Sequence, residues 1–104
     1  MDDADVREKF SAYMNAVRTA AMPLCQPDGV YAGENGAMRL ARECGPAMLD
    51  FGDYGEQSIG ATYSGICVIA YGLKPPIDAK TWLKELRTGM EKARKIKNER
   101  RYDP

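Results

Sequence analysis

The chain contains no histidine, and this one absence removes several classes of functional site. Histidine is the commonest general base and the commonest metal ligand, because its imidazole changes charge near neutral pH. Without it, no Ser-His or Cys-His catalytic pair can form. Any activity that depends on an imidazole of this chain is therefore excluded.

Cysteine is scarce, with only Cys25, Cys44 and Cys67 in 104 residues. Their spacings of 19 and 23 residues match no disulfide framework, and they lack the paired spacing of a zinc site. We expect three reduced thiols that fill space in the core, and no metal or other cofactor. The best candidate nucleophile is Cys67, but its neighbours Ile66 and Val68 predict a buried thiol with a raised pKa, which is unreactive.

Long apolar segments are also missing. The longest uninterrupted apolar run covers residues 66–71, far short of the ~20 residues that cross a membrane as a helix. The chain starts with acidic residues, whereas a secretory signal needs a basic start followed by about 7–15 apolar residues. We therefore expect a cytoplasmic protein that does not enter a membrane.

The composition is that of an ordinary globular protein, with 44% hydrophobic and 29% charged residues. This balance argues against disorder of the whole chain. A length of 104 residues is typical of one domain. The expected organisation is a single domain over residues 1–104, with a frayed tail over residues 98–104.

Two amphipathic helices are predicted, one near each end of the chain. The first covers residues 5–22, where apolar residues recur every three or four positions, and it ends before Pro23. The second covers residues 78–98 and begins with Asp78 as an N-cap. Its buried stripe is expected to contain Trp82, Leu83, Leu86, Met90 and Ala93.

The segment between these helices is rich in glycine, and short alternating apolar runs separate its turn signals. Residues 30–32 and 37–42 flank an Asn-Gly pair, which is a strong hairpin signal. Further strand-sized runs are residues 47–51, 59–63 and 66–71. The pattern predicts an antiparallel β-meander of four or five strands. The expected fold class is therefore α+β, with an N-terminal helix, the meander, and a C-terminal helix with a basic end.

One of these runs has a second interpretation. Ala37, Leu40, Ala41 and Cys44 also fit the i, i+3, i+4, i+7 spacing of a helix, which the Gly-Pro pair at 45–46 would end. Periodicity does not separate strand from helix in so short a run. The strand is the favoured interpretation, and the helix remains open.

Charge is balanced in total but divided along the chain. Residues 1–60 carry ten acidic and five basic residues, whereas residues 61–104 carry five acidic and ten basic residues. A local field depends on this arrangement rather than on the net charge. Basic residues gather at the end of the second predicted helix: Lys92, Arg94, Lys95, Lys97, Arg100 and Arg101. This cluster is a candidate surface for an acidic protein, for nucleic acid or for a second copy of the chain.

A short acidic segment is the second candidate surface. Asp50, Asp53 and Glu56 occur close together around Tyr54. Their spacing fits no calcium loop, and a solvated turn is the simplest interpretation. We also consider these four residues a candidate contact for a cationic partner.

No nucleotide-binding or catalytic motif is present, and no stretch identifies a family. The leading hypothesis is a small non-enzymatic adaptor or inhibitor of a protein complex. Stand-alone inhibitors encoded by phages and other mobile elements, including anti-CRISPR proteins, share this size and lack of motifs, which is an association by size alone. The alternative is a nucleic-acid-binding protein that uses its basic C-terminal helix. We also expect a homodimer, because the acidic part of one copy could face the basic part of another.

Overall fold

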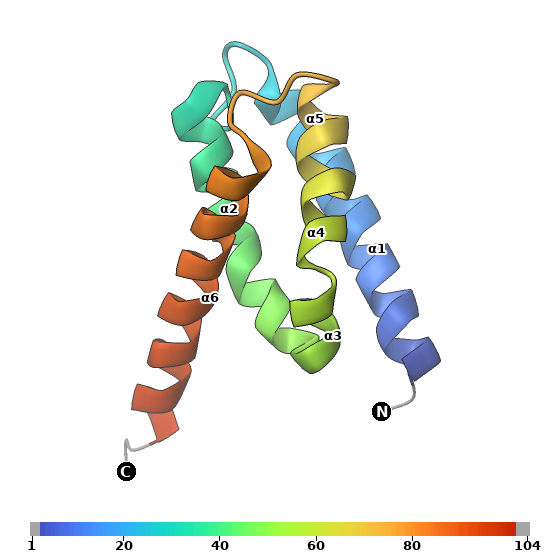
Figure 1. The fold of residues 1–104 in the computed structure, drawn as a ribbon, viewed down its shortest axis with the longest axis vertical. Helices are drawn as coiled ribbons and strands as arrows, with labels where there is room; N and C mark the ends of the chain where they lie inside the picture. Colours follow the sequence, from blue (N-terminus) through green and yellow to red (C-terminus); the bar gives the residue numbers. More distant parts are fainter. Residues whose placement is uncertain (1–2, 102–104) are drawn as a thin grey trace.

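The computed structural model describes residues 3–101, and within this range every regular element is a helix (Figure 1). In chain order the elements are α1 (Asp3–Ala21), η1 (Met22–Cys25), α2 (Gly33–Asp50), α3 (Gly52–Gln57), α4 (Ile59–Thr62), η2 (Tyr63–Val68), α5 (Ile69–Tyr71) and α6 (Ala79–Arg101). The η1 element is a 3₁₀ helix, and η2 is a π-helix. Because α4, η2 and α5 follow one another without a break, we call them together the 59–71 rod.

The predicted α+β fold is wrong, since residues 3–101 contain no β-strand and hence no meander. Residues 37–42 and 47–50 belong to α2, and the runs at 59–63 and 66–71 belong to the 59–71 rod. The Asn-Gly pair that predicts a hairpin lies in the first turn of α2. For residues 37–44 the helix interpretation is correct, although the helix does not end at the Gly-Pro pair and continues to Asp50.

The glycines and the proline inside α2 explain why its sequence resembles strands and turns. The helix packs against α6 and also against η1, and the Tyr13 hydroxyl of α1 reaches the Cys44 carbonyl at 3.5 Å. In a sequence, Gly36, Gly45 and Pro46 are turn signals, and they divide this helix into strand-sized runs. Its buried residues nevertheless recur at helical spacing and lie on one half of the helix: Gly36, Ala37, Leu40, Ala41, Cys44, Gly45 and Met48.

Both long terminal helices are predicted correctly. In α1, Phe10 and Met14 are buried as the stripe requires, and the 3₁₀ turn η1 forms around Pro23. Asp78 caps α6, because its Oδ1 accepts a hydrogen bond from the Thr81 backbone N–H at 3.1 Å. The helix continues to Arg101, beyond residue 98, where the sequence predicts fraying. Residues 102–104 lie outside the described range.

The core lies where α2, α6 and the 59–71 rod meet, and α1 adds Phe10, Met14 and Ala21 to it. Its largest fully buried side chains are Trp82, Met48, Ile66, Leu86, Thr62 and Cys67. Thr62 is polar, and its hydroxyl donates a hydrogen bond to the Ser58 carbonyl at 3.0 Å. Trp82 packs edge-on against the ring of Tyr63, with 5.8 Å between ring centroids. The core therefore fastens α6 to the rod as well as to α2.

Two glycines allow α2 and α6 to cross in direct backbone contact. A Cβ on Gly45 would lie only 2.6 Å from the backbone nitrogen of Met90. A Cβ on Gly89 would overlap the backbone carbonyl oxygen of Arg42. That carbonyl lacks its usual helical partner, because the residue four positions on is Pro46, which has no N–H. The crossing therefore needs glycine on both helices.

The two ends of the molecule differ in chemistry. The start of α1, the short helix α3 and the end of α6 lie at one end, and the loops around η1 and α5 lie at the other (Figure 1). Most of the large exposed apolar side chains belong to the second end: Met22, Leu24, Val30, Ile69 and Leu73. The charged segments that the sequence singles out thus share one end. No helix within residues 3–101 combines the length and the apolar character needed to cross a membrane.

Candidate interaction surfaces and a pocket

The basic end of α6 is open to solvent. The side chains of Lys92, Arg94, Lys95 and Lys97 are all exposed. Ile96, which lies among them, is itself 47% exposed. Arg100 and Arg101 continue the helix, but their side chains lie outside the described part of the chain. The predicted basic surface is therefore present over residues 92–97.

A row of cations also follows the outer side of α6 from its first turn. Lys80, Lys84, Arg87 and Lys95 are exposed and recur at helical spacing, so they share one face. We call these four residues the outer row. At a rise of 1.5 Å per residue the row is ~22 Å long. Glu91 is exposed on the same face and interrupts the positive charge.

In the structure, the carboxylates of the acidic segment are exposed, whereas its tyrosine ring is packed against another helix. Asp50 ends α2, and Asp53 and Glu56 lie on α3, with all three side chains exposed. Tyr54 is half-buried instead, and its ring lies edge-on to Phe10 with 5.3 Å between centroids. The carboxylates thus form a surface, whereas Tyr54 packs α3 against α1.

The fold brings the acidic segment and the basic helix together. Oε1 of Glu56 lies 3.5 Å from Nη2 of Arg94. A hollow of about 290 Å³ surrounds this pair and is lined by Leu49, Gly52, Asp53, Glu56, Met90, Arg94 and Lys97. A second hollow of about 370 Å³ is lined by Pro46, Leu49, Asp50, Ala93, Ile96 and Lys97. Because Leu49 and Lys97 line both hollows, we treat the two as one feature and call it the α6 groove.

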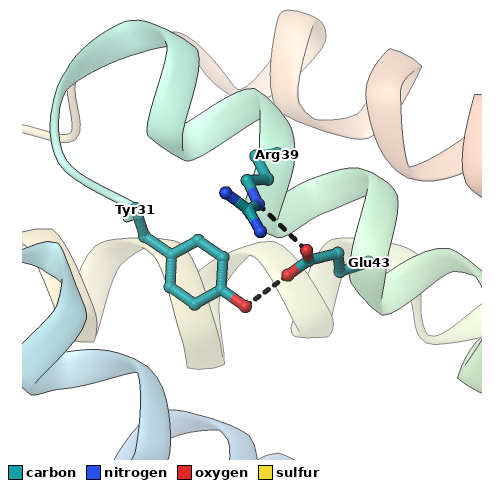
Figure 2. Close-up of polar contacts among 3 residues, drawn as sticks. All are labelled: Tyr31, Arg39 and Glu43. Atoms are coloured by element: carbon teal, nitrogen blue, oxygen red, sulfur yellow. Dashed lines mark hydrogen bonds and ion pairs between the residues drawn. The ribbon is translucent and has the colours of Figure 1, made fainter. Parts of the chain in front are cut away.

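A separate pocket of about 260 Å³ lies between α1 and α2. Glu43 lies at this pocket and accepts hydrogen bonds from Arg39 Nε, at 3.1 Å, and from the Tyr31 hydroxyl (Figure 2). Desolvation opposes ionisation of Glu43, but the hydrogen bonds from Tyr31 and Arg39 outweigh it, so the pKa of this carboxyl is lowered. The hydrogen bond to Glu43, together with desolvation, raises the pKa of Tyr31 to about 12. At neutral pH the pair is therefore a carboxylate and a neutral phenol.

The thiols and carboxylates do not assemble into a reactive centre or a metal centre. Desolvation raises the pKa of Cys44 to about 11 and that of Cys67 to about 12. Cys25 is half-buried, and desolvation raises its pKa as well. Raised pKa values keep thiols protonated and poorly nucleophilic. Within residues 3–101, no three His, Cys, Asp or Glu side chains are placed to hold a metal ion.

Sequence reasoning finds the two charged segments but misses their contact and misses the pocket. The contact joins residues 53–56 to residues 94–97, and the strand interpretation of the middle segment gives no way to place them together. Arg39 and Glu43 stand four residues apart, which favours an ion pair only if the segment is helical. Reading residues 37–44 as a helix would therefore have pointed to Glu43.

Comparison with protein-family models, with curated proteins and with solved structures finds no match to this chain. The function is therefore argued from the chemistry of these surfaces.

Proposed function

We propose that this is a cytoplasmic protein that acts without catalysis, as an adaptor or inhibitor that binds a surface of alternating charge on another protein through the α6 groove and the basic residues beside it. The observation that carries the proposal is the composition of the groove. Apolar side chains of Leu49, Ala93 and Ile96 line it together with the cations Arg94 and Lys97.

A protein partner fits this composition well. Protein interfaces combine an apolar centre with a polar rim, and arginine is enriched in them. Ile96 is 47% exposed and offers apolar area that a partner could bury. The carboxylates of Asp50 and Asp53 line the same groove and would repel a phosphate backbone. These carboxylates would instead favour a partner surface on which acidic and basic side chains alternate.

Two double charge reversals test the proposal. The groove variant Arg94→Glu/Lys97→Glu and the outer-row variant Lys80→Glu/Lys84→Glu change the net charge of the chain equally, but only the first alters the groove. We expect the wild-type protein to capture one stoichiometric protein partner at physiological salt, the groove variant to lose it, and the outer-row variant to keep it. Circular dichroism establishes that both variants fold.

Capture of no stoichiometric partner by the wild-type protein at physiological salt would refute the proposal. Equal loss in both variants would show that the charge of the whole helix, rather than the groove, drives binding.

Nucleic acid binding is the second candidate, and the outer row is the observation that favours it. Its four cations with Arg94 would neutralise about five phosphates, so the logarithm of the binding constant should fall with the logarithm of salt concentration at a slope of about −4 to −5. Titration of random-sequence duplex DNA at ~50 mM salt tests this alternative. Binding that both charge-reversed variants weaken would support it, and no binding would eliminate it.

A further inference from the structure

The pocket between α1 and α2 has the features of a small-molecule site. Its walls are largely apolar and come from Val17, Ala20, Ala21, Leu24, Leu40, Cys44 and Ala47. Polar groups are few and are contributed by Tyr13, Tyr31 and Glu43. An apolar cavity with a small number of convergent polar groups is the usual form of a ligand-binding site. The pocket shares no lining residue with the α6 groove, so the two sites are independent.

The volume of the pocket suits one aromatic ring system. Its volume is about 260 Å³. An apolar protein cavity of about 150 Å³ is enough to bind benzene. The pocket is open to solvent on one side, where Ala20 and Glu43 are exposed, so a single substituted ring or two fused rings would lie in it with one edge uncovered.

The polar groups determine which ring fits best. Each carboxylate oxygen accepts more than one hydrogen bond, so Glu43 keeps acceptor capacity beyond its bonds from Arg39 and Tyr31. Arg39 balances the negative charge of Glu43, and the other residues that line the pocket are uncharged. A charged ligand would therefore lose its hydration without a matching unpaired charge. A neutral ligand with one hydrogen-bond donor would bond to Glu43 and bury most of the rest of its surface.

We propose that the pocket between α1 and α2 binds a neutral aromatic small molecule that carries one hydrogen-bond donor, of the phenol or indole class. The ring lies against Val17, Leu40 and Ala47, and the O–H or N–H of the ligand donates to Glu43. Leu24 is 39% exposed at this pocket, and a bound ring would cover part of its side chain.

Titration with matched ligands tests the proposal. Phenol and toluene have nearly the same shape, as do indole and 1-methylindole apart from one methyl group, but only phenol and indole carry a donor. We follow backbone amide shifts of the full chain by NMR as each ligand is added. We expect saturable shifts at α1 and α2, and an affinity about tenfold higher for each donor than for its partner, because hydrogen bonds to charged groups are strong.

Two variants connect binding to this pocket. Glu43→Gln should remove most of the preference for phenol over toluene, and Ala47→Phe should fill the cavity and abolish saturable binding. Ala61→Phe adds the same side chain at an exposed position outside the pocket and should leave binding unchanged. If Ala47→Phe does not fold, the Glu43→Gln arm still decides the result.

Shifts that do not saturate, or that Ala47→Phe leaves intact in a folded protein, would overturn the site. Equal affinities for phenol and toluene in the wild-type protein would overturn the role assigned to Glu43 and, with it, the ligand class.

Discussion

The buried thiols link protonation to stability. Cys44 is 3% exposed and Cys67 is fully buried, so their apolar surroundings penalise the thiolate. Desolvation raises their pKa values from an ordinary value of 9.0 to about 11 and about 12. The folded protein therefore keeps both protons at a pH where the unfolded chain releases them. Stability is fully present below pH 9 and falls as the pH rises toward the folded-state values.

This linkage predicts an alkaline loss of stability that depends on the buried thiols. Between pH 8 and pH 10 the wild-type protein should lose about 1 kcal/mol of unfolding free energy for each buried thiol. Cys44→Ala should lose about 1 kcal/mol less over the same interval. Urea unfolding at both pH values measures the difference. The pKa values of the half-buried Tyr13 and Tyr71 are raised as well, which is why the comparison with the variant is needed. An equal loss in both proteins would contradict the assignment to Cys44.

Among the elements, the crossing of α2 and α6 gives the sharpest prediction. Alanine normally favours a helix over glycine by up to ~1 kcal/mol. At Gly45 this gain is outweighed, because the new Cβ would lie 2.6 Å from the Met90 nitrogen and 2.7 Å from the Leu86 carbonyl oxygen. We expect Gly45→Ala to lower the unfolding free energy by about 1–3 kcal/mol.

Gly60 is the matched control, since it is an exposed helical glycine where an added Cβ would meet no neighbouring atom within 4 Å. Gly60→Ala should raise the unfolding free energy by about 0.5–1 kcal/mol. Thermal or chemical unfolding measures both changes. A stabilising Gly45→Ala would show that the helices separate easily, and that the crossing is not close-packed.

Buried glycines also explain which helices could be predicted from the sequence and which could not. The terminal helices α1 and α6 are long and have one buried stripe each, so their periodicity is clear. In the middle, Gly36 and Gly45 read as turn signals, yet both are buried within α2, where another part of the backbone comes close. Only the tertiary contacts distinguish a packing glycine from a turn glycine. The Gly-Pro pair misleads for a related reason, because α2 tolerates the lost hydrogen bond of Pro46.

For the whole molecule, the sequence predicts which residues are charged surface but not how they meet. Lys92 and Lys95 are exposed as expected, because the last turns of α6 have few apolar residues to bury. The contact between Glu56 and Arg94 depends on α2, which carries the acidic segment down the molecule to the end of α6. No short-range pattern encodes such a contact. This exposed ion pair contributes only ~0–1 kcal/mol to the stability of the fold, so its main effect is on the shape of the groove.

The arrangement of charge also predicts self-association. The acidic start of α1, with Asp5 and Glu8 exposed, lies at the same end of the molecule as the basic end of α6 (Figure 1). A two-fold dimer could then place each acidic end against the basic helix of the other copy. Exposed ion pairs are weak and screened by salt, so burial of Ile96 must add to the stability of the dimer. We expect a dimer by light scattering at low salt and a smaller average mass at high salt.

Charge reversal at the two contact surfaces tests this dimer, because a change in net charge alone would not restore association when two variants are mixed. Asp5→Lys/Glu8→Lys makes the start of α1 basic, and Lys92→Glu/Lys95→Glu/Lys97→Glu makes the end of α6 acidic. Each variant alone should be monomeric, because both of its contacts now join like charges. An equal mixture should form a mixed dimer, since both contacts are again between opposite charges. A monomer mass for the wild-type protein at high concentration and low salt, or a mixture that stays monomeric, would rule out this arrangement.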